Sequence, residues 1–318
     1  MDISIIIVNY NTTDHLINCL KSIIRFTKIV TCEIIVVDNN SPDREIENYP
    51  SLFPEVKFFF RKVNDGFGAG CNFGAMNAAG KYLAFVNPDI LFVSDCLSGM
   101  FMYYENNPET GVCGPLLKDF DGNLSYIYSD FPDIKWEYHE ATGKGNRKRM
   151  DEHLSVFSKS GKNDSYIEVD WLTGACILIK NELFKRLNGY DTDYFLYYED
   201  TDLQFRIKNL GYKIICLKDF EVKHFINSSI RSIEGENIFY FNFNRSKLLY
   251  MYKHFSFLKR NIIRFMHIAG ILARIILLPL RKKFSTNKNQ KKTQYKKMLS
   301  LYLSGYKNIV QSAYNNNL

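Results

Sequence analysis

Two acidic segments of the chain carry residue types at spacings that allow chemistry. The first, Asn87-Pro88-Asp89, follows the short apolar run Tyr82–Val86. This run predicts a strand buried on both faces of a parallel sheet, and Pro88 ends it because proline cannot donate to a sheet ladder. Ligands of open α/β sheets bind at the carboxyl ends of strands, so Asn87 and Asp89 are placed to hold a divalent cation and, through it, phosphate oxygens. The alternative is a turn closed by an Asx cap.

The second segment is Glu199-Asp200-Thr201-Asp202, at the predicted start of a helix. Acidic residues at a helix N-terminus often only stabilise the helix dipole. Here Tyr197 and Tyr198 precede them and lower the local polarity, which a general base benefits from. The segment therefore predicts either a general base or a charged helix end.

The sheet that must position these groups is predicted by buried apolar runs. Ile3–Val8, Ile34–Val37 and Val56–Phe60 predict three strands before Tyr82, with helical or small-residue segments between them. This alternation indicates a parallel, doubly wound α/β sheet with right-handed crossovers. Asp38 ends the second strand, where it either accepts a hydrogen bond from a base or ribose or forms an ordinary turn.

The segment Asn64–Gly68 opens a helix rich in glycine and alanine, whose small side chains allow close packing on the sheet or a ligand. Two nucleotide motifs are absent. Cys71 stands where a dinucleotide fingerprint requires glycine, and the sequence contains no G-x-x-x-x-G-K-[ST]. A bound nucleotide must therefore be held in another way.

The later segments are less regular. Residues 133–165 are predicted to be a mobile, polar insertion. Trp171 precedes a Gly-Ala turn and the strand Cys176–Ile179, and it either stacks on a sugar ring or packs in the core. Ile214–Leu217 predicts another strand. His224 follows it, and a lone histidine is more often structural than a ligand.

Together these segments resemble the family 2 glycosyltransferases, especially the bacterial rhamnosyltransferase-like branch. The resemblance implies the α/β GT-A fold, with a mostly parallel central sheet flanked by helices and, in this chain, a helical basic C-terminal region. The resemblance covers Ile3–Ser229, and its motifs are short but jointly specific in order and spacing. They are Val8–Asn11, Val37–Ser41, Asn64–Gly68 with Asn72 and Gly74, Asn87–Asp89, Thr173–Ala175, Glu199–Leu203 with Arg206, and His224.

The resemblance implies a site for a nucleotide-diphosphate sugar, either dTDP- or UDP-linked. Asp38 binds the base or ribose, and Asp89 binds Mg²⁺ or Mn²⁺ on the diphosphate with His224 as a further metal ligand. Asn87 stands where the family's D-x-D motif has its first aspartate, which removes one negative charge. The implied donor-binding residues are Asn9, Tyr10, Asp38, Asn40, Gly66, Asn72, Asn87 and Asp89.

The resemblance also implies an inverting reaction. Asp200 matches the catalytic base, and Glu199 assists it or orients the acceptor, a saccharide or lipid-linked saccharide of a surface polysaccharide. The branch favours dTDP-rhamnose as donor and leaves UDP-hexoses and UDP-galactofuranose open. The implied acceptor-binding residues are Trp171, Thr173, Gly174 and Ala175.

Other classes fit less well. A sugar-nucleotide nucleotidyltransferase needs a glycine-rich loop with a basic residue after its first strand, where this chain has Asn9-Tyr10-Asn11. A catalytically inactive, membrane-associated binding protein would not need Asp89, Asp200 and His224 together.

Charge divides the chain into a predicted catalytic domain, 1–236, and a basic C-terminal region, 237–318. The whole chain of 318 residues carries a net charge of +7. The C-terminal region holds 16 Lys and Arg and no Asp or Glu, which leaves 25 basic and 34 acidic side chains in residues 1–236. The contrast predicts an anionic partner for the C-terminal region.

Residues 258–284 predict the form of that partner. They are too interrupted to span a bilayer, but Arg260, Arg264, His267, Arg274 and Arg281 share one arc of a helix. This pattern predicts a helix in an anionic membrane interface. The alternative is a helix packed on the catalytic domain with its basic stripe in solvent. Nucleic acid is not expected, because no recognised binding module surrounds the lysines.

The seven cysteines are scattered and form no C-x-x-C motif, which predicts reduced core residues in a cytosolic compartment. Met1-Asp2 leads directly into a strand, so no signal peptide is expected. The predicted location is cytoplasmic, peripheral on the inner face of the cell membrane. The oligomeric state is left open.

Overall fold

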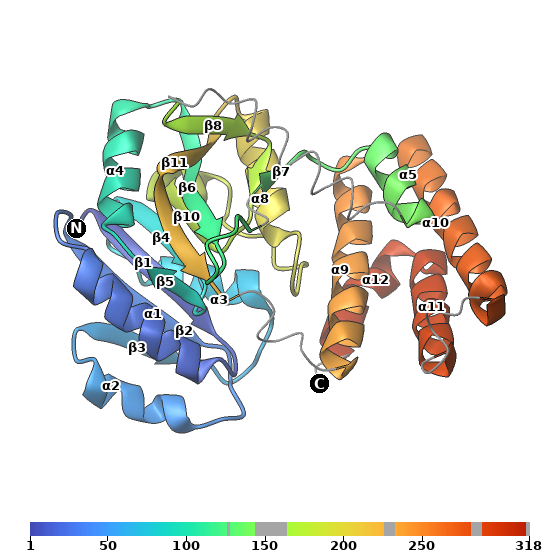
Figure 1. Ribbon diagram of the computed structural model, residues 1–318, viewed down its shortest axis with the longest axis horizontal. Coiled ribbons are helices and arrows are strands. Elements are labelled where there is room, and N and C mark those ends of the chain that lie inside the picture. The colour runs from blue at the N-terminus through green and yellow to red at the C-terminus, as the bar shows by residue number, and fades with distance from the viewer. Residues whose placement is uncertain (126–127, 144–163, 226–232, 281–287, 316–318) are drawn as a thin grey trace. The chain divides into compact units, whose positions relative to one another are not determined.

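The structure is a computed structural model that describes residues 1–125, 128–143, 164–225, 233–280 and 288–315 (Figure 1). The described residues form two compact units. The first takes in residues up to 131, 164–195 and 199–225, and the second takes in 132–143, 196–198 and 233–315. The second unit thus contains a segment from the middle of the chain besides the predicted C-terminal region.

The first unit contains most of the predicted catalytic domain and is called the catalytic unit below. The first half of its sheet is parallel, as predicted. Its strands run in the order β3-β2-β1-β4, and all three pairings are parallel. Every residue of β1 is buried, as its β-branched run predicts. The strands are β1 (Ile3–Asn9), β2 (Cys32–Asp38), β3 (Val56–Phe60) and β4 (Tyr82–Val86).

The second half of this sheet also contains antiparallel strands, so the sheet is mostly parallel, as the predicted fold class has it, and not parallel throughout. β10 (Cys176–Lys180) lies antiparallel between β4 and β6 (Thr110–Lys118). β11 (Lys213–His224) is parallel to β6 but antiparallel to β5 (Ile90–Phe92) and β8 (Tyr166–Val169). A separate small sheet pairs β7 (Tyr128–Ser129) with β9 (Trp171–Leu172).

Helices flank the sheet of the catalytic unit (Figure 1). They are α1 (Thr13–Phe26), α2 (Tyr49–Leu52), α3 (Phe67–Met76), α4 (Cys96–Asn106), α7 (Asn181–Arg186) and α8 (Glu199–Asn209), with a 3-10 turn at Glu45–Asn48. The glycines of α3 allow the predicted close packing. A Cβ on Gly74 would lie 2.5 Å from Ile6 Cγ2, and one on Gly70 would lie 2.9 Å from Val8 Cγ1.

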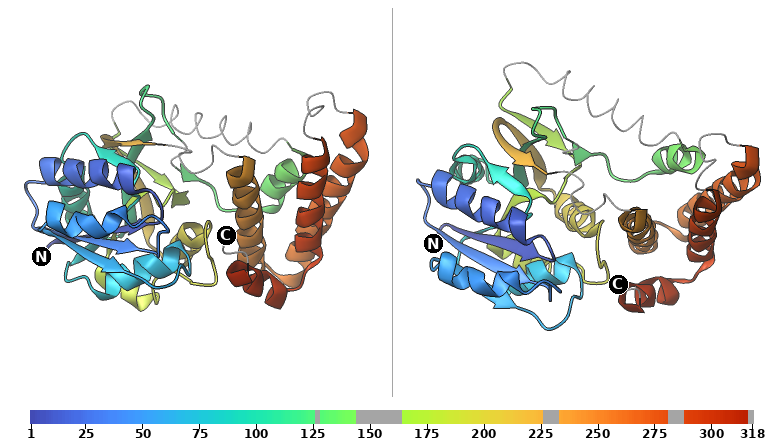
Figure 2. Two further views of the ribbon diagram at one scale, coloured as in Figure 1. Left: turned by 90° about the horizontal axis from the view of Figure 1, so that it is seen from below. Right: turned by 60° about the horizontal axis from the view of Figure 1, so that its bottom comes forward.

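The second unit, called the helical unit below, consists of helices. They are α5 (Ile134–Thr142), α9 (Ile233–His254), α10 (Phe257–Leu277), α11 (Lys288–Leu303) and α12 (Tyr306–Asn315), with a 3-10 turn at Leu278–Leu280. The prediction of a mobile insertion is therefore wrong at residues 134–142, where Asp133 caps α5 by accepting from Trp136 N. Residues 144–163 lie outside the described residues. The two views of Figure 2 show α5 beside α10.

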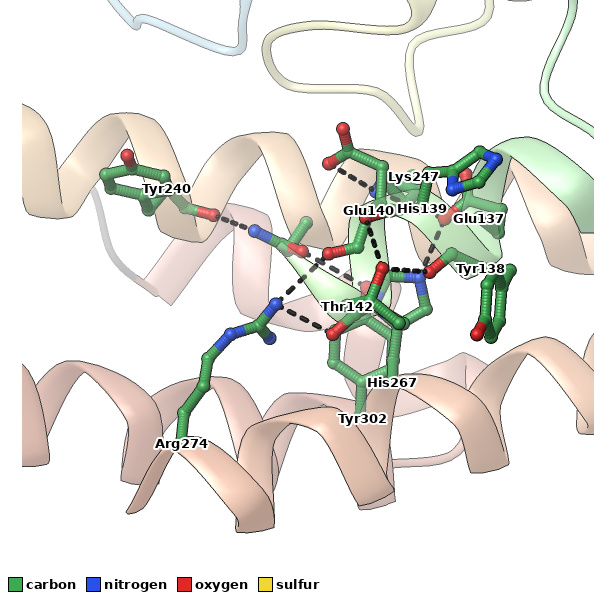
Figure 3. A network of polar contacts seen from close by, with 12 residues as sticks. Glu137, Tyr138, His139, Glu140, Thr142, Tyr240, Lys247, His267, Arg274 and Tyr302 are labelled. Carbon is green, nitrogen blue, oxygen red and sulfur yellow. Dashed lines mark hydrogen bonds and ion pairs between the residues drawn. The ribbon is translucent and has the colours of Figure 1, made fainter. Parts of the chain in front are cut away.

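A buried polar cluster joins three of these helices (Figure 3). Glu137 of α5 lies 3.2 Å from Lys247 Nζ of α9 and 2.7 Å from His267 Nε2 of α10. All three side chains are at most 5% exposed. Burial raises the pKa of Glu137, but the charge of Lys247 and the His267 hydrogen bond outweigh it and hold the pKa below its ordinary value. Burial lowers the pKa of His267 despite Glu137, so His267 is neutral and donates to the carboxylate.

Within the described part of the chain, no helix is long and apolar enough to cross a membrane. The seven cysteines are free thiols, and six of them are buried, as predicted.

Candidate active site

The end of β4 brings two predicted metal ligands together. Asp89 follows β4 and His224 ends β11, which pairs with β5 so that His224 lies opposite Ile90. Phe225 N also donates to the carbonyl of Asp89 at 3.1 Å. As a result His224 Nε2 lies 3.4 Å from Asp89 Oδ1, with the two side chains 15% and 17% exposed. Strand pairing thus joins residues that are far apart in the sequence.

A carboxylate and an imidazole at this separation suit a hard or borderline divalent ion, because oxygen and imidazole nitrogen ligate Mg²⁺ or Mn²⁺. Among the described residues, no three or more His, Cys, Asp or Glu side chains gather as a closed metal cage. A pair with open positions fits an ion that takes its other ligands from a diphosphate. The donor set therefore fits the metal that the sequence predicts.

Asp200 is held by two backbone donors at the start of α8. Gly174 N donates to Asp200 Oδ2 at 2.8 Å, and Thr201 N donates to Oδ1 at 2.7 Å. Burial raises the pKa of Asp200 above its ordinary value, while these hydrogen bonds oppose the rise. An oriented carboxylate of raised pKa has the properties of a general base.

Glu199 is the more buried of the two acidic residues, at 5% exposure. Within the described chain, its Oε2 has no hydrogen-bond partner. Burial and then the charge of Asp200 raise the pKa of Glu199 well above its ordinary value. Of the two neighbouring carboxyls, Glu199 therefore holds its proton more strongly than Asp200.

The loop that carries the predicted acceptor residues is fastened to α8 by Gln204. This fully buried amide accepts from Leu172 N at 2.8 Å and donates to Leu172 O at 2.7 Å. The indole of Trp171 donates to Asp130 O at 3.2 Å. Thr173 follows, half-buried, and leads to Gly174. Ala175 O then accepts from Asn87 N at 2.8 Å, which links this loop to the end of β4.

The nucleotide side of the site is built on Asp38, which is 2% exposed. Its carboxylate accepts from Asn9 Nδ2 at 2.8 Å, from Ser41 Oγ at 2.5 Å and from Ser41 N at 2.9 Å. A carboxylate has about four acceptor positions, and these donors use three of them. Asn9 itself is fully buried and orients Asp38. Of the adjoining predicted residues, Tyr10 is 41% exposed and Asn40 has φ 61°.

Asn39 and Arg61 complete this region. Asn39 Nδ2 donates to Gly66 O at 2.9 Å, and its Oδ1 accepts from Arg61 at 3.0 Å. Arg61 also pairs with Asp65. Gly66 has φ +105°, and a Cβ there would lie 2.4 Å from the carbonyl oxygen of Phe195. Gly66 is therefore required by its close approach to the backbone at Phe195.

Asn72, which the resemblance names as a donor-binding residue, binds the backbone of Tyr190. Its Nδ2 donates to Tyr190 O at 2.8 Å and its Oδ1 accepts from Tyr190 N at 2.9 Å. Both ends of the amide are thus used on one backbone unit. We interpret Asn72 as a positioning residue for the Gly189-Tyr190 turn, where Arg206 also donates to Gly189 O at 2.9 Å.

The structure thus brings Asp89 together with His224, Asp200 with Gly174, and Asn9 with Asp38. Sequence reasoning did not identify Gln204, Asn39 and Arg61, which hold the site's backbone. An isolated amide in a helix, such as Gln204, carries no sequence pattern that predicts a hydrogen bond to a distant backbone group. Asn39 lies inside the Val37–Ser41 motif.

Residues 4–187 of the chain match the family model described as glycosyl transferase family 2. The chain belongs to glycosyl transferase family 2. It is 25% identical over 232 residues to an N-acetylglucosaminyl-diphospho-decaprenol L-rhamnosyltransferase of Mycobacterium tuberculosis (strain CDC 1551 / Oshkosh), covering 69% of this chain and 75% of that protein. It is 28% identical over 152 residues to rhamnosyltransferase WbbL of Escherichia coli (strain K12), covering 48% of this chain and 54% of WbbL.

Two solved glycosyltransferases resemble the structure of this family 2 member. GalNAc-T7 with UDP, GalNAc and Mn²⁺ has a TM-score of 0.60 at 14% identity, covering 99% of this chain and 58% of that one. Mannosyltransferase PcManGT from Pyrobaculum calidifontis, in complex with GDP-Man and Mn²⁺, has a TM-score of 0.57 at 13% identity, covering 94% and 85%. At these identities the likeness shows the fold, which is the predicted GT-A fold. The chain is a glycosyltransferase.

Proposed function

We propose that this transferase moves rhamnose from dTDP-rhamnose, with inversion, onto a hydroxyl of a saccharide or lipid-linked saccharide in surface polysaccharide synthesis. The observation that carries the inverting reaction is the bond from Gly174 N to Asp200 Oδ2. It holds a single base of α8 against the loop whose Ala175 carbonyl also accepts from Asn87 N, at the end of β4. The names of the two rhamnosyltransferase relatives support rhamnose as the sugar.

The residues of the chain divide the work of a single displacement. The remaining acceptor position of Asp38 takes a donor group of the base or ribose. Asp200 accepts the proton of the acceptor hydroxyl as this hydroxyl attacks the anomeric carbon. Protonated Glu199 donates a hydrogen bond that orients the acceptor. Because the nucleophile comes from the acceptor, the enzyme forms no covalent intermediate and the configuration inverts.

Asp89 and His224 would hold the Mg²⁺ or Mn²⁺ ion. When bound, the ion stabilises the negative charge that develops on the leaving diphosphate. Asn87, as a neutral residue in the motif, contributes an amide and no charge. Asp89 is therefore the carboxylate on which this site depends.

The acceptor enters along the loop from Trp171 to Ala175. The backbone groups of Gly174 and Ala175 are engaged with Asp200 and Asn87, so these residues shape the site. The side chains of Trp171 and Thr173, both only partly buried, are the ones placed to contact a sugar. A lipid-linked acceptor, as the name of the mycobacterial relative describes, would place the enzyme in the cytoplasm at the inner face of the cell membrane.

Release of nucleoside diphosphate from a donor panel tests the proposal. The panel is dTDP-rhamnose, UDP-galactose, UDP-galactofuranose, UDP-glucose and UDP-N-acetylglucosamine, each with Mn²⁺ and with EDTA, and with membrane extract as acceptor source. We expect turnover of dTDP-rhamnose that EDTA abolishes and that Asp200→Asn reduces. Turnover of a UDP-sugar alone would replace rhamnose as the substrate, and turnover in EDTA would refute the metal site.

A further inference from the structure

The outward face of α10 is an uninterrupted apolar stripe. Its members recur every three or four residues, so they align along one side of the helix. Four large side chains of the stripe, with their exposed fractions, are Leu258 (71%), Phe265 (72%), Leu272 (43%) and Ile276 (72%). Ile262 (42% exposed) and the exposed Ala269 complete the stripe. Monomeric proteins rarely expose so long a run of large apolar side chains without a partner.

The basic side of the same helix is turned inward, which reverses the arrangement predicted from the sequence. Arg264 donates to the carbonyls of Tyr302 and Ser304 at 2.7 and 3.1 Å, which caps the end of α11. His267 binds Glu137. Arg274 donates to the carbonyls of Glu140 and Ala141 at 3.1 and 2.7 Å, near the end of α5 (Figure 3). These basic groups are used inside the helical unit, so the apolar face is the side left outward.

We propose that the apolar stripe of α10 docks into the interface of an anionic lipid bilayer. The positive charge of the C-terminal region favours an anionic bilayer over an uncharged apolar partner. The region 237–318 carries 16 basic and no acidic side chains, and Lys292, Lys296 and Lys297 of neighbouring α11 are exposed. Basic residues beside an apolar helix face are attracted to anionic headgroups, while the face itself enters the acyl boundary.

A second copy of the chain is a poorer occupant. Coiled-coil partners pair through complementary charges that flank the apolar seam. None of the positions that flank this stripe is acidic, so two copies could form no complementary charge pair there; these positions are Lys259, Asn261, Met266, Ile268, Ala273 and Ile275. Two copies of α10 would also bring together segments that carry only positive charge. An anionic bilayer would therefore both bury the apolar face and attract the basic residues, whereas a second copy would only bury the apolar face.

The dimensions of α10 suit a helix that lies in the plane of the interface. Its 21 residues extend about 30 Å, and the apolar side of such a helix is buried about 5–10 Å deep. The inference deepens the proposed function, on which it rests for the presence of a lipid-linked acceptor. It places the enzyme on the surface where such an acceptor is found.

Co-sedimentation of the full chain with vesicles tests the proposal, using an equimolar mixture of phosphatidylglycerol and phosphatidylcholine and, separately, pure phosphatidylcholine. We expect binding to the mixed vesicles that weakens in high salt. Phe265→Glu with Ile276→Glu should weaken it at least about tenfold, because two exposed apolar contacts become like-charged with the lipid. Ile29→Glu with Met102→Glu is the matched control, since both residues are exposed apolar side chains outside α10, at 67% and 46% exposure.

The outcomes separate this inference from the proposed function. Thermal unfolding and release of nucleoside diphosphate with a water-soluble acceptor should be unchanged in the α10 variant. Equal vesicle binding by wild type and the α10 variant, or no binding by wild type, overturns the docking surface whatever the activity shows. A dimer of the wild type that the α10 variant abolishes, with no vesicle binding, would assign the stripe to a second copy and also overturn the proposal. Absence of donor turnover in the wild type, the α10 variant and the control variant would instead count against the proposed function.

Discussion

The backbone N–H of Gly174 lies 2.8 Å from Asp200 Oδ2 and donates a hydrogen bond to it. The next residue, Ala175, accepts from Asn87 N at 2.8 Å. Two adjacent residues therefore connect the candidate base to the strand end that carries Asp89. A displacement reaction needs the base and the leaving-group site at a fixed separation, and this short path of two hydrogen bonds joined by one peptide unit supplies it.

Gly174→Ala should lower kcat while leaving the KM for the donor nearly unchanged. The added Cβ would lie 3.0 Å from Asp200 Cβ and 3.2 Å from Oδ2, so the carboxylate must shift. A misplaced base costs about 10²-fold in rate. Steady-state kinetics check this, with Gly305→Ala as control, because nothing lies within 4 Å of a Cβ added at Gly305. Equal kcat for the two variants would contradict a positioning role for Gly174.

Asp200→Asn should reduce kcat about 10²–10⁴-fold, the usual contribution of a general base. Glu199→Gln should cost far less, because in the proposed mechanism Glu199 only orients the acceptor and the neutral amide can still donate a hydrogen bond. The opposite order of effects would exchange the two roles.

The pH profile of kcat/KM follows from the raised pKa of Asp200. The base acts only when deprotonated, so activity should fall on the acidic side at a pH above the ordinary aspartate value of 3.8. In Glu199→Gln this acidic limb should remain, whereas in Asp200→Asn the residual activity should lack it. An acidic limb unchanged in Asp200→Asn would assign the titration to another group.

Asp89→Asn should weaken binding of Mn²⁺ in the presence of dTDP by at least about 10–100-fold, because loss of an outer-shell partner alone costs this much and Asp89 is the carboxylate of the two-residue site. Isothermal titration calorimetry measures this without turnover. His224→Gln should weaken binding as well. Asp95→Asn is the control, since Asp95 caps α4 by accepting from Ser98 N and lies outside the pair. Unchanged Mn²⁺ affinity in both site variants would remove the metal from this position.

Glu137→Gln should destabilise the protein by about 3–5 kcal/mol, because it leaves Lys247 charged and buried without its nearest partner. Glu140→Gln should cost less than about 1 kcal/mol. Its carboxylate is 3.7 Å from Lys247 Nζ and 18% exposed, so it is the weaker partner. Chemical denaturation of both variants checks the order, and equal losses would contradict the importance of Glu137.

The pH dependence of stability should follow His267 first. Its folded pKa is below the ordinary 6.5, so the unfolded state binds a proton first and stability should fall as the pH drops below about 6.5. Glu137, whose folded pKa is below the ordinary 4.5, adds stability that is present above that value and is lost as the pH falls through its folded pKa. Thermal melts from pH 8 to about 2 check both, and His267→Gln should flatten the upper part of the curve.

The sequence predicted the parts of the fold that rest on local patterns. β1 to β4 and the start of α8 lie at the expected residues, because buried runs and acidic helix starts are local signals. The antiparallel β10, between β4 and β6, was not predicted. A buried run shows that a strand is central but not which way it runs, and its neighbours come from distant parts of the chain.

The site was predicted as residue types and not as contacts. A motif can name Asp89 and His224, but only the pairing of β11 with β5 shows that they meet. The helical wheel of α10 separated its basic and apolar sides correctly. It could not show which side faces the protein, because arginine side chains can bind backbone carbonyls in the interior as well as water or lipid.

The Glu137 cluster has a consequence for the order in which the chain is made. α5 leaves the ribosome about a hundred residues before α9, so the carboxylate of Glu137 cannot meet the cation of Lys247 or the imidazole of His267 until these residues emerge. During synthesis α5 therefore lacks these packing partners while the sheet of the catalytic unit forms. The helical unit can accordingly fold only after most of the chain has been made. A product truncated before His267 would keep the residues of the sheet but lack part of the buried cluster that joins α5, α9 and α10.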